Sequence, residues 1–421
     1  ATYKDDSGLT TFTMTGGTIK KCKALKANGG GVFVFYSNFE LSGNASITDC
    51  TAMEYGDCIL IDRSNATFTV NDSNITINGQ IMQYFGSALI NGLGTAKFPY
   101  QIGDKAELVL FGSIVNGTAG NYIPAQRGAC AELTADVDLE NDAWTPIGPD
   151  EGSSYTGTFD GKGYTIKNLN VSGSGNIGLF GYVSGGTIRN LTVSGSVKGS
   201  EHTGGIAGAA NGGTFENCAN QCAVQGGTTG GIIGFATEEG TLIVRDCYNV
   251  GSITTTTGNS VGGIIGQCIN TSGTIRNCYN AGTVTGTASV GAIIGNPVSD
   301  RIYNCYYLDG SVIRNGNGDK VSISKTATEF ADGTVLALLK TGERDNNADP
   351  WDTTCKYLES AGMTLPVLAS QNLTVHDHVW STYTTDTAAK THTRSCACGV
   401  AETEACTITP ATCKDAGSVD R

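Results

Sequence analysis

The chain has 421 residues, enough for two or three ordinary domains or for one long solenoid with appendages. It contains 59 glycines, only 8 prolines and 15% charged residues, which favours a solenoid with many tight corners, and the glycines lack the three-residue period of collagen. The formal net charge of −13 argues against binding nucleic acid or an anionic membrane, and no apolar run is long enough to cross a bilayer.

Residues 1–125 are expected to form the N-terminal coils of a β-helix. Phe12, Phe39 and Phe68 recur at intervals of 27 and 29 residues, and Cys22 and Cys50 lie 28 residues apart. Each phenylalanine lies in a short segment of strand-forming residues. The rhythm breaks between about residues 91 and 149, which we interpret as longer loops on one or two coils of a single continuous solenoid.

Residues 126–310 form the most regular part of the sequence. Glycine-bracketed clusters occupy residues 176–181, 203–208, 229–234, 261–266 and 290–295, and their closing glycines lie 27, 26, 32 and 29 residues apart. A repeat of this length is one structural unit that buries its apolar face against its neighbours. The sequence therefore predicts an all-β fold, a parallel β-helix, and the strong preference of parallel crossovers makes it right-handed.

Each repeat also carries an Asn or Asp at a predicted corner, because these residues tolerate left-handed backbone and can hydrogen-bond to a stacked neighbour. The residue after the corner is predicted to point inward, and in four repeats it is a cysteine: Cys218, Cys247, Cys278 and Cys305. A buried thiol behaves as a small apolar residue, so we interpret these cysteines as core filling. Disulfides along the ladder and a redox device are the alternatives.

Tyrosines follow several of the inward cysteines and are predicted to point outward. Tyr248, Tyr279, Tyr306 and Tyr307 form a candidate aromatic strip that could bind a ligand, because flat aromatic faces stack on sugar rings and on protein surfaces. The alternative is that the tyrosines stack on one another and stabilise the sheet.

One outward register holds charged residues, Arg189, Glu216, Arg245 and Arg276. A polysaccharide lyase needs a basic residue to abstract a proton, so this register invites a catalytic interpretation. A solvated charge ladder, in which Glu216 neutralises its neighbours, is the favoured alternative. No carboxylate pair stands out for glycoside hydrolysis, and we assign no catalytic residue and no cofactor-binding residue.

Residues 311–370 are expected to form a C-terminal cap. Apolar residues between 326 and 340 predict a short helix that covers the exposed last coil, since an uncovered coil is an unpaired β edge. Residues 345–349 match the first half of a calcium loop, but Pro350 follows where glycine is needed, so a turn is the favoured interpretation.

Residues 371–421 form a tail rich in threonine, histidine and cysteine. His378, His392, Cys396 and Cys398 are the candidate ligands of a structural zinc ion, although only one residue separates the two cysteines. Disulfides, or a disordered and incomplete final unit, are the alternatives.

The central repeats resemble the GLUG-type repeats of bacterial surface proteins. The likeness rests on the Val-Gly-Gly-Ile-Ile-Gly cluster and on the Gly-Thr-Ile-Arg-Asn-Cys-Tyr-Asn-Ala-Gly-Thr-Val unit. Residues 131–166 look like the segment that leads into such arrays, residues 304–368 look like the closing segment, and the likeness covers about residues 126 to 370. The tail is similar to the short Cys/His repeats of Gram-positive surface proteins.

This resemblance implies a secreted or surface-displayed bacterial protein. The expected role is an adhesin-like stalk or ligand-binding β-helix without catalysis, whose partner is a host glycan or a surface protein. One alternative is a carbohydrate-active lyase or hydrolase with a groove near residues 130–160. The other is a structural subunit of a surface fibre that self-associates end to end.

Overall fold

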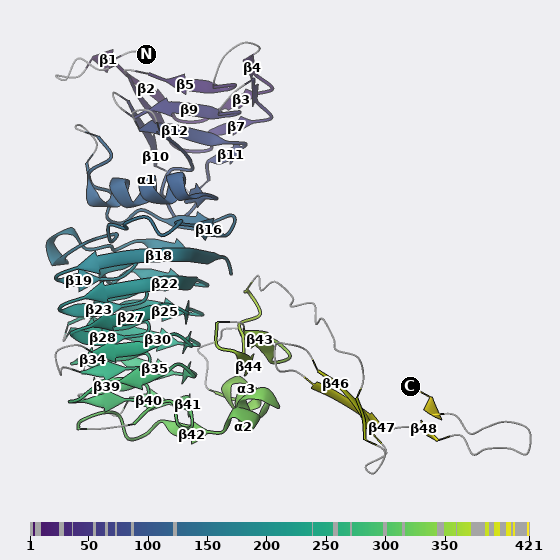
Figure 1. Ribbon diagram of the computed structural model, residues 1–421. Helices are drawn as coiled ribbons and strands as arrows, with labels where there is room; N and C mark the ends of the chain where they lie inside the picture. The colour runs from purple at the N-terminus through teal and green to yellow at the C-terminus, as the bar shows by residue number, and fades with distance from the viewer. Residues whose placement is uncertain are drawn as a thin grey trace, which may run out of the picture.

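The structure is a computed structural model, shown in Figure 1. It describes residues 11–371 except for positions 25–28, 36, 54–55, 64–65, 72–73, 86–87, 121–123, 238, 256–259, 270–271, 298–300, 314–315, 343–348 and 359. It also describes the backbone, without the side chains, of residues 3–4, 10, 384–386, 391–395, 401–405, 407–408 and 419–420.

The described part of the chain folds as a parallel β-solenoid of about 10 turns, so the predicted β-helix fold is confirmed. Its longest sheet has twelve strands and runs along the whole stack. The strands of this sheet are β5 (Val32–Val34), β9 (Ile59–Asp62), β12 (Ile81–Phe85), β13 (Ala88–Asn91), β14 (Tyr100–Ile102), β15 (Ala131–Leu133), β17 (Thr158–Asp160), β21 (Thr187–Arg189), β25 (Gly213–Glu216), β30 (Leu242–Arg245), β35 (Thr274–Arg276) and β40 (Ile302–Tyr303).

Three further sheets complete the walls of the central coils. An eleven-stranded sheet holds β16 (Val137–Asp138), β18 (Thr165–Gly173), β22 (Thr192–Gly199), β26 (Ala219–Asn220), β27 (Ala223–Gly226), β31 (Tyr248–Asn249), β32 (Ile253–Thr255), β36 (Tyr279–Asn280), β37 (Val284–Thr285), β41 (Tyr306–Leu308) and β42 (Ile323–Lys325). One five-stranded sheet holds β19 (Asn176–Ile177), β23 (His202–Gly204), β28 (Thr228–Gly230), β33 (Val261–Gly262) and β38 (Val290–Gly291). The other five-stranded sheet holds β20 (Phe180–Ser184), β24 (Ala207–Asn211), β29 (Ile233–Ala236), β34 (Ile265–Cys268) and β39 (Ile294–Pro297).

The N-terminal coils contribute shorter sheets of their own. A four-stranded sheet holds β1 (Tyr3–Lys4), β2 (Thr10–Met14), β6 (Ser37–Leu41) and β10 (Thr67–Val70). A three-stranded sheet holds β3 (Thr18–Lys20), β7 (Ser46–Thr48) and β11 (Thr76–Asn78), and a two-stranded sheet holds β4 (Lys23–Ala24) and β8 (Thr51–Ala52). The remaining elements are α1 (Lys105–Asn116), the 3₁₀ turn η1 (Glu151–Ser153), α2 (Ala327–Ala331), α3 (Thr334–Lys340), β43 (Lys356–Leu358), β44 (Met363–Leu365), β45 (Thr384–Asp386), β46 (Thr391–Ser395), β47 (Ala401–Ala405), β48 (Thr407–Ile408) and β49 (Val419–Asp420).

The predicted corners are present. Asn190, Asn217, Asp246, Asn277 and Asn304 all adopt left-handed backbone, with φ between 51° and 54°. Their side chains hydrogen-bond from coil to coil, for example from Asn217 Nδ2 to Asn190 Oδ1 at 3.0 Å and from Asn304 Nδ2 to Asn277 Oδ1 at 2.8 Å. The corner therefore combines a tolerated backbone conformation with a stacking hydrogen bond.

A second asparagine ladder lies inside the coils. Asn220, Asn249 and Asn280 are fully buried and follow the tyrosine register. Asn220 Nδ2 donates to Asn249 Oδ1, and Asn249 Nδ2 donates to Asn280 Oδ1, both at 2.7 Å. Because buried amides must be paired, this ladder satisfies the polar groups of three neighbouring coils at once.

The central glycines of the repeated clusters are required by packing and not by a positive φ. The positive-φ glycines in the described chain do not include Gly205, Gly231 or Gly263. A Cβ atom on Gly231 would lie 2.8 Å from Asn249 Oδ1, and one on Gly205 would lie 2.1 Å from Asn220 Oδ1. These glycines are needed because the inner asparagine ladder and the neighbouring backbone leave no room for a side chain.

Where longer loops were predicted, between about residues 91 and 149, the solenoid contains an antiparallel segment and a helix. β12, β13 and β14 pair antiparallel, and α1 follows them across the end of the central coils (Figure 1). Phe111 of α1 packs edge-on against Tyr100 and Tyr155. One hydrophobic core therefore ends near Ile81, and a second begins near Phe85, because the helix closes the larger core.

The C-terminal cap forms its predicted helical segment as α2 and α3, but it does not cover the last coil. It lies against the side of the lower coils, where Phe330, Leu336 and Leu339 pack with outward tyrosines (Figure 1). The last coil is closed instead by residues 309–325. Among these, Asp319 Oδ2 accepts hydrogen bonds from Ile293 N at 2.9 Å and Ile294 N at 3.1 Å.

Candidate functional site

The predicted aromatic strip is not exposed. Tyr248 and Tyr279 are fully buried, and Tyr306 and Tyr307 retain only 4% and 8% of their accessible surface. Tyr248 and Tyr279 do point outward and stack in parallel, with ring centroids 5.0 Å apart, but the cap covers them. The prediction that these tyrosines form an accessible ligand-binding surface is therefore wrong, because the cap covers the rings of Tyr248, Tyr279 and Tyr306. Tyr307 lies in the register of the inner asparagine ladder, opposite Asn280.

Hydrogen bonds fix the cap to this tyrosine face. Tyr279 Oη donates to the carbonyl of Pro366 at 2.6 Å. Gln371 joins Tyr248 Oη, at 2.7 Å, to Thr192 Oγ1, at 2.8 Å. The cap and the coils therefore pack as one unit. We call the line of contact between the cap and the tyrosine face the seam, and it begins beside the asparagine corners.

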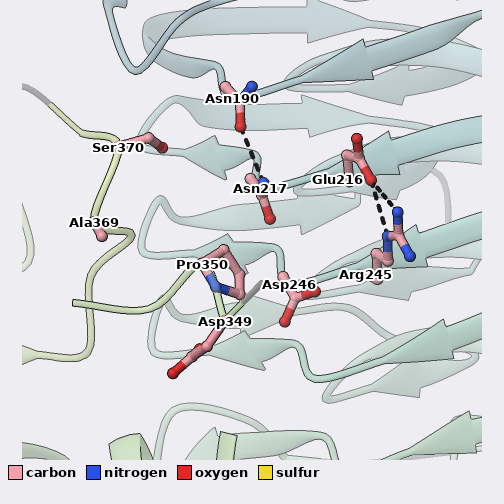
Figure 2. A pocket seen from close by; sticks show the side chains of 9 residues that line it. All are labelled: Asn190, Glu216, Asn217, Arg245, Asp246, Asp349, Pro350, Ala369 and Ser370. Carbon is pink, nitrogen blue, oxygen red and sulfur yellow. Dashed lines mark hydrogen bonds and ion pairs between the residues drawn. The ribbon is translucent and has the colours of Figure 1, made fainter. Parts of the chain in front are cut away.

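A hollow of about 380 Å³ lies in this seam (Figure 2). The corners and the charged register of β25 and β30 form one wall, and two stretches of the cap form the other. The lining residues are Asn190, Glu216, Asn217, Arg245, Asp246, Asp349, Pro350, Ala369 and Ser370. The hollow therefore presents amide, carboxylate and hydroxyl groups within a concave surface.

Each carboxylate that lines the hollow has a partner. Glu216 accepts two hydrogen bonds from Arg245, one of them from Nε at 2.9 Å, and both side chains are mostly buried. Asp246 Oδ1 accepts from the indole Nε1 of Trp351 at 3.2 Å. Asp349 lies 3.4 Å from Lys340 Nζ. The walls are thus held in fixed positions, as a binding site requires.

This arrangement suits binding better than glycoside hydrolysis. A glycosidase needs one carboxyl group that carries a proton and a second that faces it across the cleaved bond. Here Glu216 forms an ion pair with a guanidinium, and Asp246 and Asp349 accept hydrogen bonds or face a cation. Fixed acceptors of this kind match the hydroxyl groups of a polar ligand.

The charged register is paired differently from the predicted ladder. Glu216 lies between Arg189 and Arg245 in register, but it binds Arg245 alone. Arg189 Nε instead donates to Asp160 Oδ2 at 3.0 Å, on the preceding coil. Arg189 and Arg245 therefore belong to two separate ion pairs and are not free bases for a lyase.

The inward cysteines are free thiols in the described part of the chain and fill the core as predicted. Each Sγ donates to the carbonyl two residues earlier, for example from Cys247 to Arg245 O at 3.1 Å. Burial raises the pKa of the Cys218, Cys247 and Cys278 thiols well above the ordinary value. These thiols are therefore protonated and inert at neutral pH.

The candidate zinc ligands lie outside the residues whose side chains are described. Only the backbone of His392 is described, in β46, and His378, Cys396 and Cys398 lie outside the described residues. Most of the calcium-loop motif, residues 345–348, also falls in a gap. Within the described residues, no group of three or more potential ligands is placed to hold a metal ion.

Sequence reasoning missed the outer wall of the hollow. Asp349 and Pro350 were considered only at the end of the calcium-loop match, and Ala369 and Ser370 carry no motif. The corner residues of the inner wall were recognised, but as structural elements. The one available signal was Trp351, an aromatic residue with a polar edge, which now connects the cap to Asp246.

The fold and the hollow define a parallel β-helix with a lateral cap. No protein-family model matches the chain. It is 28% identical over 215 residues to halomucin from Haloquadratum walsbyi, a match that covers 48% of this chain and only 2% of that protein. A solved structure described as a "putative immunoglobulin A1 protease" from Bacteroides ovatus aligns with a TM-score of 0.48 and 22% identity, over 67% of this chain and 95% of that chain.

No helix in the described part of the chain is long and apolar enough to span a membrane.

Proposed function

We propose that the protein is a secreted or surface-displayed β-helix that binds a ligand without catalysis, in the manner of an adhesin. The observation that supports this proposal most directly is the polar hollow at the seam between coils and cap. Its carboxylates are paired and its walls are fixed, which favours recognition over bond cleavage. The ligand class is a host glycan or the surface of a host protein.

The surface setting rests on the similarity to a stretch of halomucin and on the repeat sequence. We further propose that the coils are GLUG-type repeats of a bacterial surface protein. The long parallel sheets that run from coil to coil suit an extracellular scaffold, because hydrogen-bonded ladders leave few local openings for proteases.

The test uses the full chain on an array of mammalian glycans and immobilised host glycoproteins. We expect selective retention that weakens at least fivefold in Asp349→Ala with Ser370→Ala, two exposed residues on the outer wall of the hollow. Asp309→Asn, an exposed carboxylate on another loop, is the matched control and should bind normally.

Neutral and uronic polysaccharides are incubated with the same protein to test the enzymatic alternative. Turnover of either class would show that the chain is a carbohydrate-active enzyme. If the double variant retains the ligand as strongly as the parent protein does, binding occurs elsewhere on the surface.

A further inference from the structure

A second, smaller hollow lies beside α1, at the start of the central coils. Its volume is about 150 Å³. Val109, Gly112, Ser113 and Asn116 of α1 form one side, and residues 143–145 form the other. It shares no residue with the seam hollow, so the two sites can be tested separately.

Gly112 is the unusual residue of this hollow. It lies in the middle of α1 with helical backbone, where glycine is less favourable than alanine. A Cβ atom there would lie 3.6 Å from Ile147 Cγ1 and 3.9 Å from Trp144 Cη2, which are ordinary contacts. Packing therefore permits an alanine, and the effect of glycine is to leave the edge of Trp144 uncovered.

Trp144 forms a fixed floor for the hollow. Its indole Nε1 donates to the carbonyl of Leu179 at 2.9 Å, and its backbone N donates to Asn170 O at 2.9 Å. Asn116 fixes the loop beside it, donating to Pro146 O at 3.0 Å and accepting from Gly148 N at 2.8 Å. These bonds hold an aromatic surface in place before any ligand arrives.

The rest of the lining is uncharged. Ser113, Thr118 and Thr145 supply hydroxyl groups, and no ionisable side chain borders the hollow. Val109, Ala143 and the edge of the mostly buried Trp144 form an apolar patch with hydroxyl groups around it. This patch matches a sugar ring, whose C–H face is apolar and whose rim carries hydroxyls. A charged ligand would find no counter-ion here.

We propose that this hollow binds one neutral sugar unit, and that Gly112 leaves room for it because a side chain there would narrow the site. The site is distinct from the seam hollow and extends the proposed function with a second subsite. It places recognition on the end of the central coils that α1 covers.

The probes are the methyl glycosides of glucose, galactose, mannose and N-acetylglucosamine, offered to the full chain at millimolar concentration. Saturation-transfer NMR should detect at least one of them, with the strongest transfer at the ring C–H protons that face Trp144. Gly112→Ala should weaken this binding at least fivefold and should raise the midpoint of thermal unfolding by about 1–3 °C.

Asp309→Asn, whose carboxylate borders neither hollow, is the control and should leave glycoside binding unchanged. Trp144→Phe gives a second test, because a smaller ring should also weaken binding. The proposal is overturned if none of the four glycosides binds, if Gly112→Ala binds as well as the parent protein, or if Gly112→Ala lowers the unfolding midpoint.

Discussion

Single residues inside the coils show where the packing is imperfect. Thr203 and Thr229 are fully buried, and their hydroxyl oxygens have no hydrogen-bond partner. In the same inward column the neighbouring coils place Ile177, Val261 and Val290. A buried hydroxyl without a partner costs free energy, and valine has almost the same shape as threonine.

We therefore predict that Thr203→Val and Thr229→Val each raise the free energy of unfolding by about 1 kcal/mol. Urea denaturation monitored by circular dichroism measures the change. Thr214→Val is the control, because Thr214 is only partly buried on the outer face of β25 and should shift the stability by less than about 0.5 kcal/mol. A loss of stability in both buried variants would mean that the hydroxyls are satisfied after all.

The stacked thiols make stability depend on pH. Burial raises the pKa of Cys218, Cys247 and Cys278 in the folded state, whereas an exposed thiol in the unfolded chain has a pKa of about 8.5. Above that pH the unfolded chain releases protons that the folded chain retains, so the stabilising contribution is complete at lower pH and is lost as pH rises.

We expect each buried thiol to reduce the free energy of unfolding by about 2 kcal/mol between pH 8 and pH 10. Urea midpoints measured across this range test the expectation. Cys247→Ala should show a smaller loss than the parent protein over the same range, although it is less stable at pH 7. Equal pH dependence in both proteins would exclude the thiols as its source.

The asparagines show what residue type alone can predict about position in the coil. The corner asparagines were predicted because few residues tolerate left-handed backbone. The inner ladder of Asn220, Asn249 and Asn280 was missed, although each lies two residues after an inward cysteine. Only the stacked coils reveal that this position faces the core and a glycine on the neighbouring segment.

At the scale of elements, the end of the array depends on one carboxylate. In the preceding coil, Ile264 N and Ile265 N both donate to the carbonyl of Ile293. In the last coil the corresponding donors are Ile293 N and Ile294 N, and Asp319 Oδ2 accepts both. The side chain thus replaces the carbonyl that a further coil would supply.

We predict that Asp319→Ala lowers the stability of the last coil by roughly 2–5 kcal/mol, because two buried N–H groups lose their acceptor. Hydrogen exchange resolved by segment should show faster exchange in β38 and β39 while β21 to β24 stay protected. Asp319→Asn keeps one carbonyl acceptor and should have a smaller effect. Uniform destabilisation of all coils would contradict a local role.

The cap also shows the limit of prediction at this scale. Its apolar periodicity correctly indicated short helices, but not the surface that they cover. The last coil was the expected surface, because an open edge needs protection. Residues 309–325 provide that protection, and the cap instead buries Tyr248, Tyr279 and Tyr306 of β31, β36 and β41.

At the scale of the whole molecule, two cores share one stack. Ile61 belongs to the N-terminal core and Ile264 to the central core, and both are fully buried. We predict that Ile61→Ala destabilises residues 32–85, and Ile264→Ala the central coils, each by about 2–5 kcal/mol and with little effect on the other half. Segment-resolved hydrogen exchange separates the two responses, and equal shifts in both halves would show a single cooperative unit.

The ends of the molecule bear on the fibre alternative. β1 pairs antiparallel with β2 at one end, and residues 309–325 cover most of the last coil at the other. Both features interrupt the parallel pairing that end-to-end stacking would extend. We therefore expect a monomer in sedimentation velocity at high concentration, and filaments seen by electron microscopy would support the fibre alternative instead.

The sequence by itself determined the repeat length, the strands, the corners and the inward cysteines, because each coil repeats the same local conformation and makes the same contacts with its neighbours. The tertiary structure decided where the cap docks, that the tyrosines are buried, that glycines make room for a hidden asparagine ladder, and that two hollows exist. These features join segments separated by as many as 179 residues, as in the bond from Gln371 to Thr192, and no local pattern encodes such pairings.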